Sequence, residues 1–118
     1  MTKAYMGKIL RVNLSAGTVT EEGLREDWTR KFIGGAGLAT KYLYDEVPSG
    51  IDPLGPENKL IFMTGPLTGT ASASAGRYSV VAKSPLTGIW GHGNSGGSFG
   101  PARTNARAAG FTSPSTKR

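Results

Sequence analysis

Residues 7–14 alternate between apolar and polar positions. Leu10 and Val12 share one face of an extended chain, and the residues between them point the opposite way, which is the two-residue period of a β-strand. Residues 15–17 supply a Ser-Ala-Gly turn, and residues 18–22 can return as a second strand. The pattern predicts a β-hairpin near the start of the chain.

The period of the pattern changes after the hairpin. Trp28 and Phe32 lie one helical turn apart, and the glycines at positions 34 and 35 stop this first short helix. Residues 37–46 form a second predicted helix, which ends before Pro48. We expect the apolar and aromatic side chains of both helices to belong to the core rather than to a cofactor site.

Two further apolar segments, residues 59–64 and 78–83, are predicted strands. Each is followed by the sequence Pro-Leu-Thr-Gly, at residues 66–69 and 85–88. The repeated order of strand and turn allows two interpretations. The two units are a repeat that occupies equivalent places in a sheet, or the four identical residues are a coincidence.

Composition limits the class of protein. The 118 residues suit one domain, and the absence of cysteine excludes disulfides, thiolate metal sites and an iron–sulfur cluster held by this chain. The first residues contain no apolar stretch long enough for a signal peptide or a membrane span. We therefore expect a soluble cytoplasmic protein with no membrane partner.

The net charge of +6 is unevenly distributed. Residues 1–101 contain ten Lys and Arg and eight Asp and Glu, whereas the rest of the chain adds four cations and no acid. Those four cations lie in a segment rich in Ser, Thr and Ala with one aromatic residue, Phe111. A nucleic-acid-binding face instead clusters its cations on an ordered element, often with aromatic residues for stacking. We expect a solvated tail and no nucleic-acid partner.

The segment Gly76–Gly100 carries the candidate binding chemistry. Seven of its 25 residues are glycine, so the backbone can approach a bound group closely and donate N–H groups to it. Arg77 stands at the entry of a predicted strand and supplies a planar set of donors suited to phosphate. The turn at residues 85–88 predicts that Arg77 and the Asn94–Gly97 loop face one cavity, a cradle for a large anionic cofactor. The alternative for Arg77 is a surface salt bridge.

The surrounding sequence excludes the common nucleotide-binding motifs. Residues 91–96 fit the spacing G-x-G-x-x-G, but a turn precedes them and no acidic residue follows Glu57. No glycine is followed by Lys-Ser or Lys-Thr, which excludes a Walker loop. His92 is the only histidine and has no catalytic or metal-binding partner nearby in the sequence. We interpret it as a loop residue.

Five segments, in order along the chain, resemble the N-terminal domain of aldehyde ferredoxin oxidoreductases: GKILRVNLSAGTV, KFIGGAGLATKYLYDEV, IDPLGPENKLIFMTGPLTGT, GRYSVVAKSPLTG and GNSGGSFGP. The resemblance extends from about Gly7 to Pro101. It implies an α+β fold with a mixed, mainly antiparallel sheet and short helices, which forms the base on which the cofactor sits. Residues 1–101 are then an incomplete copy of that domain.

The resemblance also implies an oxidoreductase that converts an aldehyde and water to a carboxylate, with tungsten or molybdenum held by two pterins of the molybdopterin type. Electrons pass through a 4Fe–4S cluster, held outside this chain, to ferredoxin. By matching motifs, Arg77, Asn94, Ser95, Gly96 and Gly97 bind the cofactor. The Asn94 backbone carbonyl binds a magnesium ion between the pterin phosphates, in line with the preference of magnesium for oxygen ligands. No residue here is expected to be catalytic, and the isolated chain is expected to be inactive.

The chain departs from the family pattern at Ala36, where many relatives have arginine, and in residues 102–118. We expect this basic segment to be a tail in which Thr112–Arg118 is disordered and cannot replace the strand of the relatives. A truncated or frameshifted gene product that lacks the C-terminal domains would explain it. The alternative function is a non-enzymatic module that binds a small anion or a partner protein.

Overall fold

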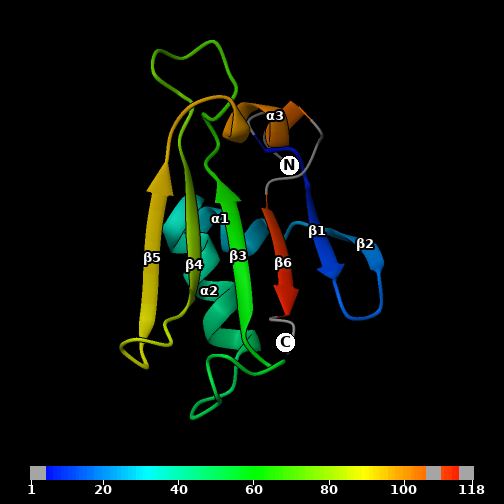
Figure 1. Cartoon of the computed structure of the whole chain (residues 1–118). Coiled ribbons are helices and arrows are strands. Elements are labelled where there is room, and N and C mark those ends of the chain that lie inside the picture. The colour runs from blue at the N-terminus through cyan, green and yellow to red at the C-terminus, as the bar shows by residue number, and fades with distance from the viewer. Residues whose placement is uncertain (1–4, 106–109, 115–118) are drawn as a thin grey trace.

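The computed structural model describes residues 5–105 and 110–114, the last of these and residues 103–105 by their backbone alone. In this part of the chain the elements are β1 (Lys8–Asn13), β2 (Thr18–Gly23), α1 (Glu26–Phe32), α2 (Gly35–Glu46), β3 (Lys59–Thr64), β4 (Tyr78–Lys83), β5 (Trp90–Ser95), α3 (Phe99–Asn105) and β6 (Gly110–Pro114). The strands form one sheet in the order β2-β1-β6-β3-β4-β5 (Figure 1). Every neighbouring pair is antiparallel except β1 and β6, which are parallel.

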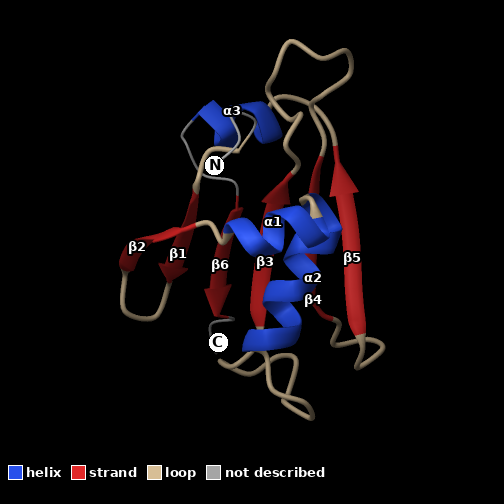
Figure 2. Cartoon of the chain, turned by 180° about the vertical axis from the view of Figure 1, so that it is seen from behind, coloured by secondary structure: helices blue, strands red, loops and turns tan. Residues whose placement is uncertain are grey.

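The core lies between this sheet and helices α1 and α2, which both cover the same face of the sheet (Figure 2). Ile61 and Met63 of β3 and Val81 of β4 point to this face, since successive strand residues alternate between faces, and all three are almost completely buried. They pack against the inner side of α2. The buried apolar cluster comprises Ile9, Leu24, Leu38, Ala39, Tyr42, Leu43, Ile61, Met63 and Val81. The domain is therefore α+β with a mixed, mainly antiparallel sheet, as the sequence predicted.

The local elements follow the apolar periodicity closely. The hairpin is formed by β1 and β2 with Lys8 opposite Gly23, and the two predicted strands 59–64 and 78–83 are β3 and β4. The helix predicted at residues 37–46 begins two residues earlier, at Gly35. None of the helices in the described residues has the length and apolar character needed to cross a bilayer.

The repeated Pro-Leu-Thr-Gly sequence does not mark equivalent places in the sheet. Strands β3 and β4 are antiparallel neighbours, with Ile61 opposite Val81. The chain therefore leaves them at opposite ends of the sheet (Figure 1). Because the turns face opposite ends, the repeat interpretation is wrong.

The expected disorder of residues 112–118 is wrong for its first three residues. Strand β6 occupies the middle of the sheet, where Thr112 lies opposite Ile61 of β3 and beside Arg11 of β1. A central strand gains backbone hydrogen bonds on both edges, and these bonds favour an ordered backbone in this segment. Residues 115–118 lie outside the described residues.

An ion-pair network fixes the C-terminal end of α2 to the sheet. Glu46 accepts hydrogen bonds from Arg11 Nη1 at 3.0 Å and from Lys59 Nζ at 3.1 Å, and Arg11 also pairs with Glu22 of β2. Partial burial raises the pKa of Glu46, but the hydrogen bonds from Arg11 and Lys59 outweigh burial and hold that pKa below its usual range. The same contact with Glu46, followed by that with Glu22, raises the pKa of Arg11.

Candidate functional site

The glycine-rich segment predicted as a loop is the edge strand β5. It pairs with β4 along its whole length, from Lys83 opposite Trp90 to Tyr78 opposite Ser95. Alternation along the strand directs Trp90, His92 and Asn94 to the face covered by α2, with glycines between them. The loop interpretation of His92 is thus wrong. The sequence Trp-Gly-His-Gly-Asn has the two-residue period of a strand, with glycine at every second position, and this pattern could have identified β5.

The structure brings Arg77 and Asn94 together, as predicted from the sequence. Arg77 Nη1 donates a hydrogen bond to Asn94 Oδ1 at 2.5 Å, so the guanidinium lies across the start of β4 and the end of β5. The buried Thr68 hydroxyl donates to the Arg77 carbonyl at 3.0 Å and accepts from the Gly65 N–H at 3.2 Å. Thr68 therefore fixes the backbone from which the Arg77 side chain extends.

Arg77 and Asn94 border a cavity of about 400 Å³ at the N-terminal end of α2. The residues that line it come from the α1–α2 turn, from the end of β3 with the following turn, and from the strands β4 and β5: Ile33, Gly34, Gly35, Met63, Gly65, Pro66, Thr68, Arg77, Tyr78, Ser79 and Asn94. Its polar side-chain groups are thus one cation, an amide and hydroxyls, beside three glycines and the apolar residues Ile33, Met63 and Pro66. Ser95, Gly96 and Gly97 follow directly along the chain and do not line this cavity, so the predicted shared cavity holds for Asn94 but not for these three residues.

Three glycines allow the backbone segments around the cavity to pack closely. A Cβ on Gly34 would lie 3.0 Å from Gly65 Cα, and a Cβ on Gly76 would lie 3.0 Å from the Gly97 carbonyl oxygen. A Cβ on Gly100 would lie only 2.6 Å from the Gly76 carbonyl oxygen, which is shorter than any stable contact. The glycines before and after β4 and β5 thus hold Arg77 next to the Asn94 end of β5.

The α1–α2 turn contributes wall residues that the sequence reasoning missed. Ile33 has φ 65° and ψ −72°, and the Gly34 N–H donates to the Phe32 carbonyl at 2.8 Å. These values describe a γ-turn of the rare, strained kind. The turn aims the first residues of α2 at the cavity. The Gly34-Gly35 pair was interpreted only as a helix stop, although a double glycine between two helices also signals a close backbone approach.

The donor set of the cavity suits a large anion better than a metal ion. No group of three or more His, Asp or Glu side chains in the described residues could hold a metal, and the sequence has no cysteine. An arginine beside amide and hydroxyl groups is typical of sites for phosphate-bearing ligands. A magnesium ion here would need backbone carbonyls and ligand oxygens.

Comparison with known proteins gives a consistent family. Residues 9–112 match the family model described as the N-terminal domain of aldehyde ferredoxin oxidoreductase. The tungsten-containing aldehyde ferredoxin oxidoreductase of Pyrococcus horikoshii is 55% identical over 96 residues, which cover 81% of this chain and 16% of that protein. The aliphatic sulfonate oxidoreductase, WOR-like subunit, of Pyrococcus furiosus is 46% identical over 85 residues, covering 70% of this chain and 13% of the relative.

A solved structure shows the same fold within a longer chain. It is the active site complex BamBC of benzoyl coenzyme A reductase with 1,5-dienoyl-CoA, which superimposes with a TM-score of 0.94 at 31% identity. The match covers 99% of this chain and 18% of that chain, so the chain spans less than a fifth of the length of the proteins it resembles. The match to residues 9–112 and the identity with the relatives show that the chain belongs to the aldehyde ferredoxin oxidoreductase family and corresponds to its N-terminal domain.

Proposed function

We propose that this chain is the cofactor-binding base of an enzyme that oxidises aldehydes to carboxylates, with ferredoxin as electron acceptor. The observation that carries the proposal is the 2.5 Å hydrogen bond between Arg77 and Asn94, which both line a cavity that also includes three hydroxyl-bearing residues. When bound, a tungsten or molybdenum bis-pterin would supply the oxidation chemistry. The residues of this chain bind and orient it and take no chemical step themselves.

The residues of the cavity fit the anionic part of such a cofactor. Arg77 provides a permanent positive charge with several N–H donors, of which one is used by Asn94. Asn94 in turn holds the guanidinium in place. We propose that Arg77 contacts the pterin and its phosphate and that the Asn94 backbone carbonyl binds the magnesium ion between the phosphates. We also propose that Ser95–Gly97, which lie outside the cavity lining, bind the part of the cofactor that extends beyond the cavity.

Electron transfer belongs to parts of the enzyme outside this chain. Thiolates of cysteine hold 4Fe–4S clusters, and this sequence contains no cysteine. We therefore expect the purified 118-residue chain to show no aldehyde-dependent reduction of viologen dyes. Dye reduction by this chain, free of other enzymes, would contradict the proposal that electron transfer takes place outside this chain.

Anion binding by the cavity can be measured without activity. The test titrates the 118-residue chain with inorganic pyrophosphate and follows amide chemical shifts by NMR, with Arg77→Ala compared with Arg30→Ala. Arg30 is an exposed cation on α1, paired with Glu26, and serves as the matched control. A lost charge-assisted contact costs about 1.5–3 kcal/mol, so we expect the dissociation constant of Arg77→Ala to rise about 10- to 150-fold. The Arg30→Ala chain should bind as the parent does.

The cofactor itself requires the rest of an enzyme. A suitable protein is a chimera in which this chain replaces the matched 96-residue segment of the Pyrococcus horikoshii relative. We expect tungsten and pterin to co-purify with the chimera and to be depleted in its Arg77→Ala variant. Pyrophosphate binding that is retained in the chimera without any pterin would favour the alternative, a non-enzymatic small-anion module. If pyrophosphate causes the same amide chemical-shift changes in Arg77→Ala and Arg30→Ala, the cavity is not the binding site.

A further inference from the structure

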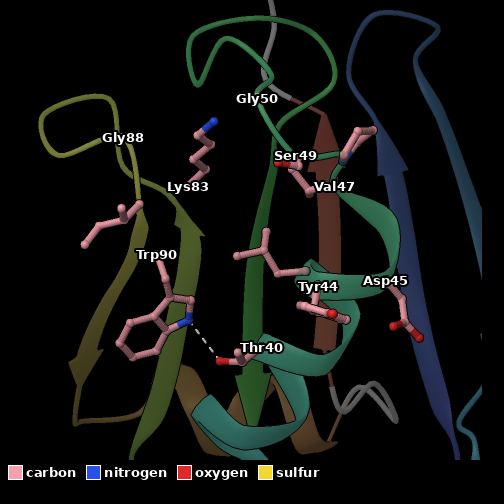
Figure 3. Close-up of a pocket in the computed structure, with 12 residues that line it drawn as sticks. Thr40, Tyr44, Asp45, Val47, Ser49, Gly50, Lys83, Gly88 and Trp90 are labelled. Carbon is pink, nitrogen blue, oxygen red and sulfur yellow. Dashed lines mark hydrogen bonds between the residues drawn. The ribbon is translucent and has the colours of Figure 1, made fainter.

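A second, apolar hollow lies along the C-terminal half of α2, away from the cavity at Arg77. It has a volume of about 660 Å³ and lies between α2 and the start of β5 (Figure 3). Leu43, Tyr44 and Val47 form one wall, and Ile89 and Trp90 form the other. A neighbouring hollow of about 600 Å³ shares Thr40, Tyr44 and Trp90 with it and adds Phe32. We call the two together the α2–β5 groove.

Large apolar side chains of this groove are exposed in the isolated chain. Tyr44 is 82% exposed, Ile89 is 67% exposed and Trp90 is 47% exposed. In the turn that precedes β5, Leu86 is 92% exposed and adds to this apolar surface. Single exposed apolar residues are normal on soluble proteins, but a contiguous set around a hollow marks an interaction surface.

The charged side chains that line the groove, and the indole N–H of Trp90, are already engaged within the chain. Trp90 Nε1 donates to Thr40 Oγ1 at 2.9 Å, and Lys83 Nζ donates to the Ile51 carbonyl at 2.7 Å. Lys41 and Asp45, which also line the groove, pair with each other at 2.8 Å. With these groups satisfied, the groove offers shape and apolar area rather than charge. An occupant with apolar side chains therefore fits it better than a polar metabolite does.

The length of the related proteins indicates where such an occupant comes from. This domain is 16% of the Pyrococcus horikoshii relative and 18% of the solved chain with the same fold. In such proteins more than four fifths of the polypeptide lies outside the domain and must pack against some of its surface. We propose that the α2–β5 groove is the docking surface for an apolar segment of the remaining polypeptide of the enzyme, with Tyr44, Ile89 and Trp90 as its main contacts.

The absence of cysteine from this chain makes the proposal measurable. Ile89→Cys places a thiol in the groove, and Val19→Cys places one at a matched position on β2, since Val19 is 62% exposed. Both variants are treated with a maleimide, alone and within the chimera with the Pyrococcus horikoshii relative, and the labelled peptides are quantified by mass spectrometry. Within the chimera we expect the labelling rate at position 89 to fall at least 10-fold, while the rate at position 19 stays close to that of the isolated chain.

A variant that places a charge in the groove tests the same surface through thermal stability. Ile89→Asp should leave the thermal midpoint of the isolated chain within a few degrees of the parent value and lower that of the chimera markedly, whereas Val19→Asp should affect neither. If the parent chimera does not accumulate, the remaining polypeptide of the relative is supplied in trans, and labelling at position 89 is measured there.

Several outcomes would overturn the proposal. They are unchanged labelling at position 89 in the assembled protein, equal slowing at positions 19 and 89, or concentration-dependent protection at position 89 in the isolated chain, which would identify a second copy as the occupant. The proposal is independent of the cofactor. Arg77→Ala should reduce pterin content without changing the protection at position 89, so failure of one proposal can be distinguished from failure of the other.

Discussion

The cavity at Arg77 and the α2–β5 groove both border α2 and β5, yet they differ in character. The cavity is lined by small residues around the N-terminal end of α2, by Arg77 and by Asn94. The groove has walls of large apolar side chains. His92 lies between them, with its ring 5.4 Å from that of Trp90 and its Nε2 atom 3.3 Å from Ser79 Oγ.

The difference shows how side-chain size divides one interface into two kinds of site. Where glycines bring backbone segments together, a fixed cation and an amide are left to meet a ligand. Where Tyr44, Ile89 and Trp90 border the hollow, most of the exposed surface is apolar. The comparison predicts that the two ends share one fold but respond separately to substitutions made at each end.

The largest effect should come from the apolar core that supports both the cavity and the groove. Leu38→Ala removes an almost fully buried side chain of α2, which should lower the free energy of unfolding by about 2–5 kcal/mol. Chemical denaturation followed by circular dichroism and by tryptophan fluorescence, to which Trp28 and Trp90 both contribute, measures this loss. Both signals should report one common transition. Separate transitions would show that the two ends of the interface are not held by one core.

Next in size is a substitution that should disturb only the polar end. Gly100→Ala places a Cβ 2.6 Å from the Gly76 carbonyl oxygen, next to Arg77, and the resulting shift should cost about 1–3 kcal/mol. Pyrophosphate binding should weaken as Arg77 moves.

Gly93→Ala is the matched control, because a Cβ there has no atom within 4 Å; we expect its free energy of unfolding to change by no more than about 0.5 kcal/mol. Equal effects of the two substitutions would mean that close packing of glycines does not position Arg77.

Acid should loosen the groove end of α2 first. Because the pKa of Glu46 in the folded chain lies below its unfolded value of 4.5, its stabilising contribution is present above that value and is lost as the pH falls through the folded pKa. Glu46→Gln should lower the free energy of unfolding at pH 7 by about 1 kcal/mol, allowing for partial exposure.

The slope of stability against pH below 4.5 should also become shallower in this variant, as measured by urea unfolding from pH 3 to pH 7. Asp45→Asn, which removes a more exposed pair with Lys41, serves as the control. If the stability of Glu46→Gln falls with acid as steeply as that of the parent, the Arg11–Glu46–Lys59 network does not set the acid dependence.

The smallest expected effect is a gain in stability at the polar end. Ile33 has a positive φ that costs a branched residue about 1–2 kcal/mol. Ile33→Gly removes this strain, and the greater freedom of glycine in the unfolded chain offsets about 0.5–1 kcal/mol of the gain. The net result should be a rise of about 0.5 kcal/mol in the free energy of unfolding. Val19→Gly, at an ordinary strand position, should instead lower it. Equal losses in both variants would argue against strain at Ile33.

The sequence by itself determined the elements whose pattern is local. The hairpin, both helices and strands β3 and β4 each bury one face of their own residues, and that face imposes a period of two or 3.6 on the sequence. The approach of Arg77 to Asn94 was also predicted, because a strand followed by a tight turn leaves little choice of where the chain returns. The family resemblance was readable for the same reason, since its motifs are contiguous segments.

Only the tertiary structure decided the pairing. Strand β5 was mistaken for a loop because its glycines outweighed the alternation of Trp90, His92 and Asn94. Strand β6 was mistaken for a disordered tail, since its place between β1 and β3 depends on backbone hydrogen bonds to distant segments. Backbone hydrogen-bonding groups are the same in every residue except proline, so the choice of a strand's neighbours leaves little trace in its own side chains. The apolar groove is likewise a product of packing, because it exists only where α2 and β5, 50 residues apart at Thr40 and Trp90, are brought side by side.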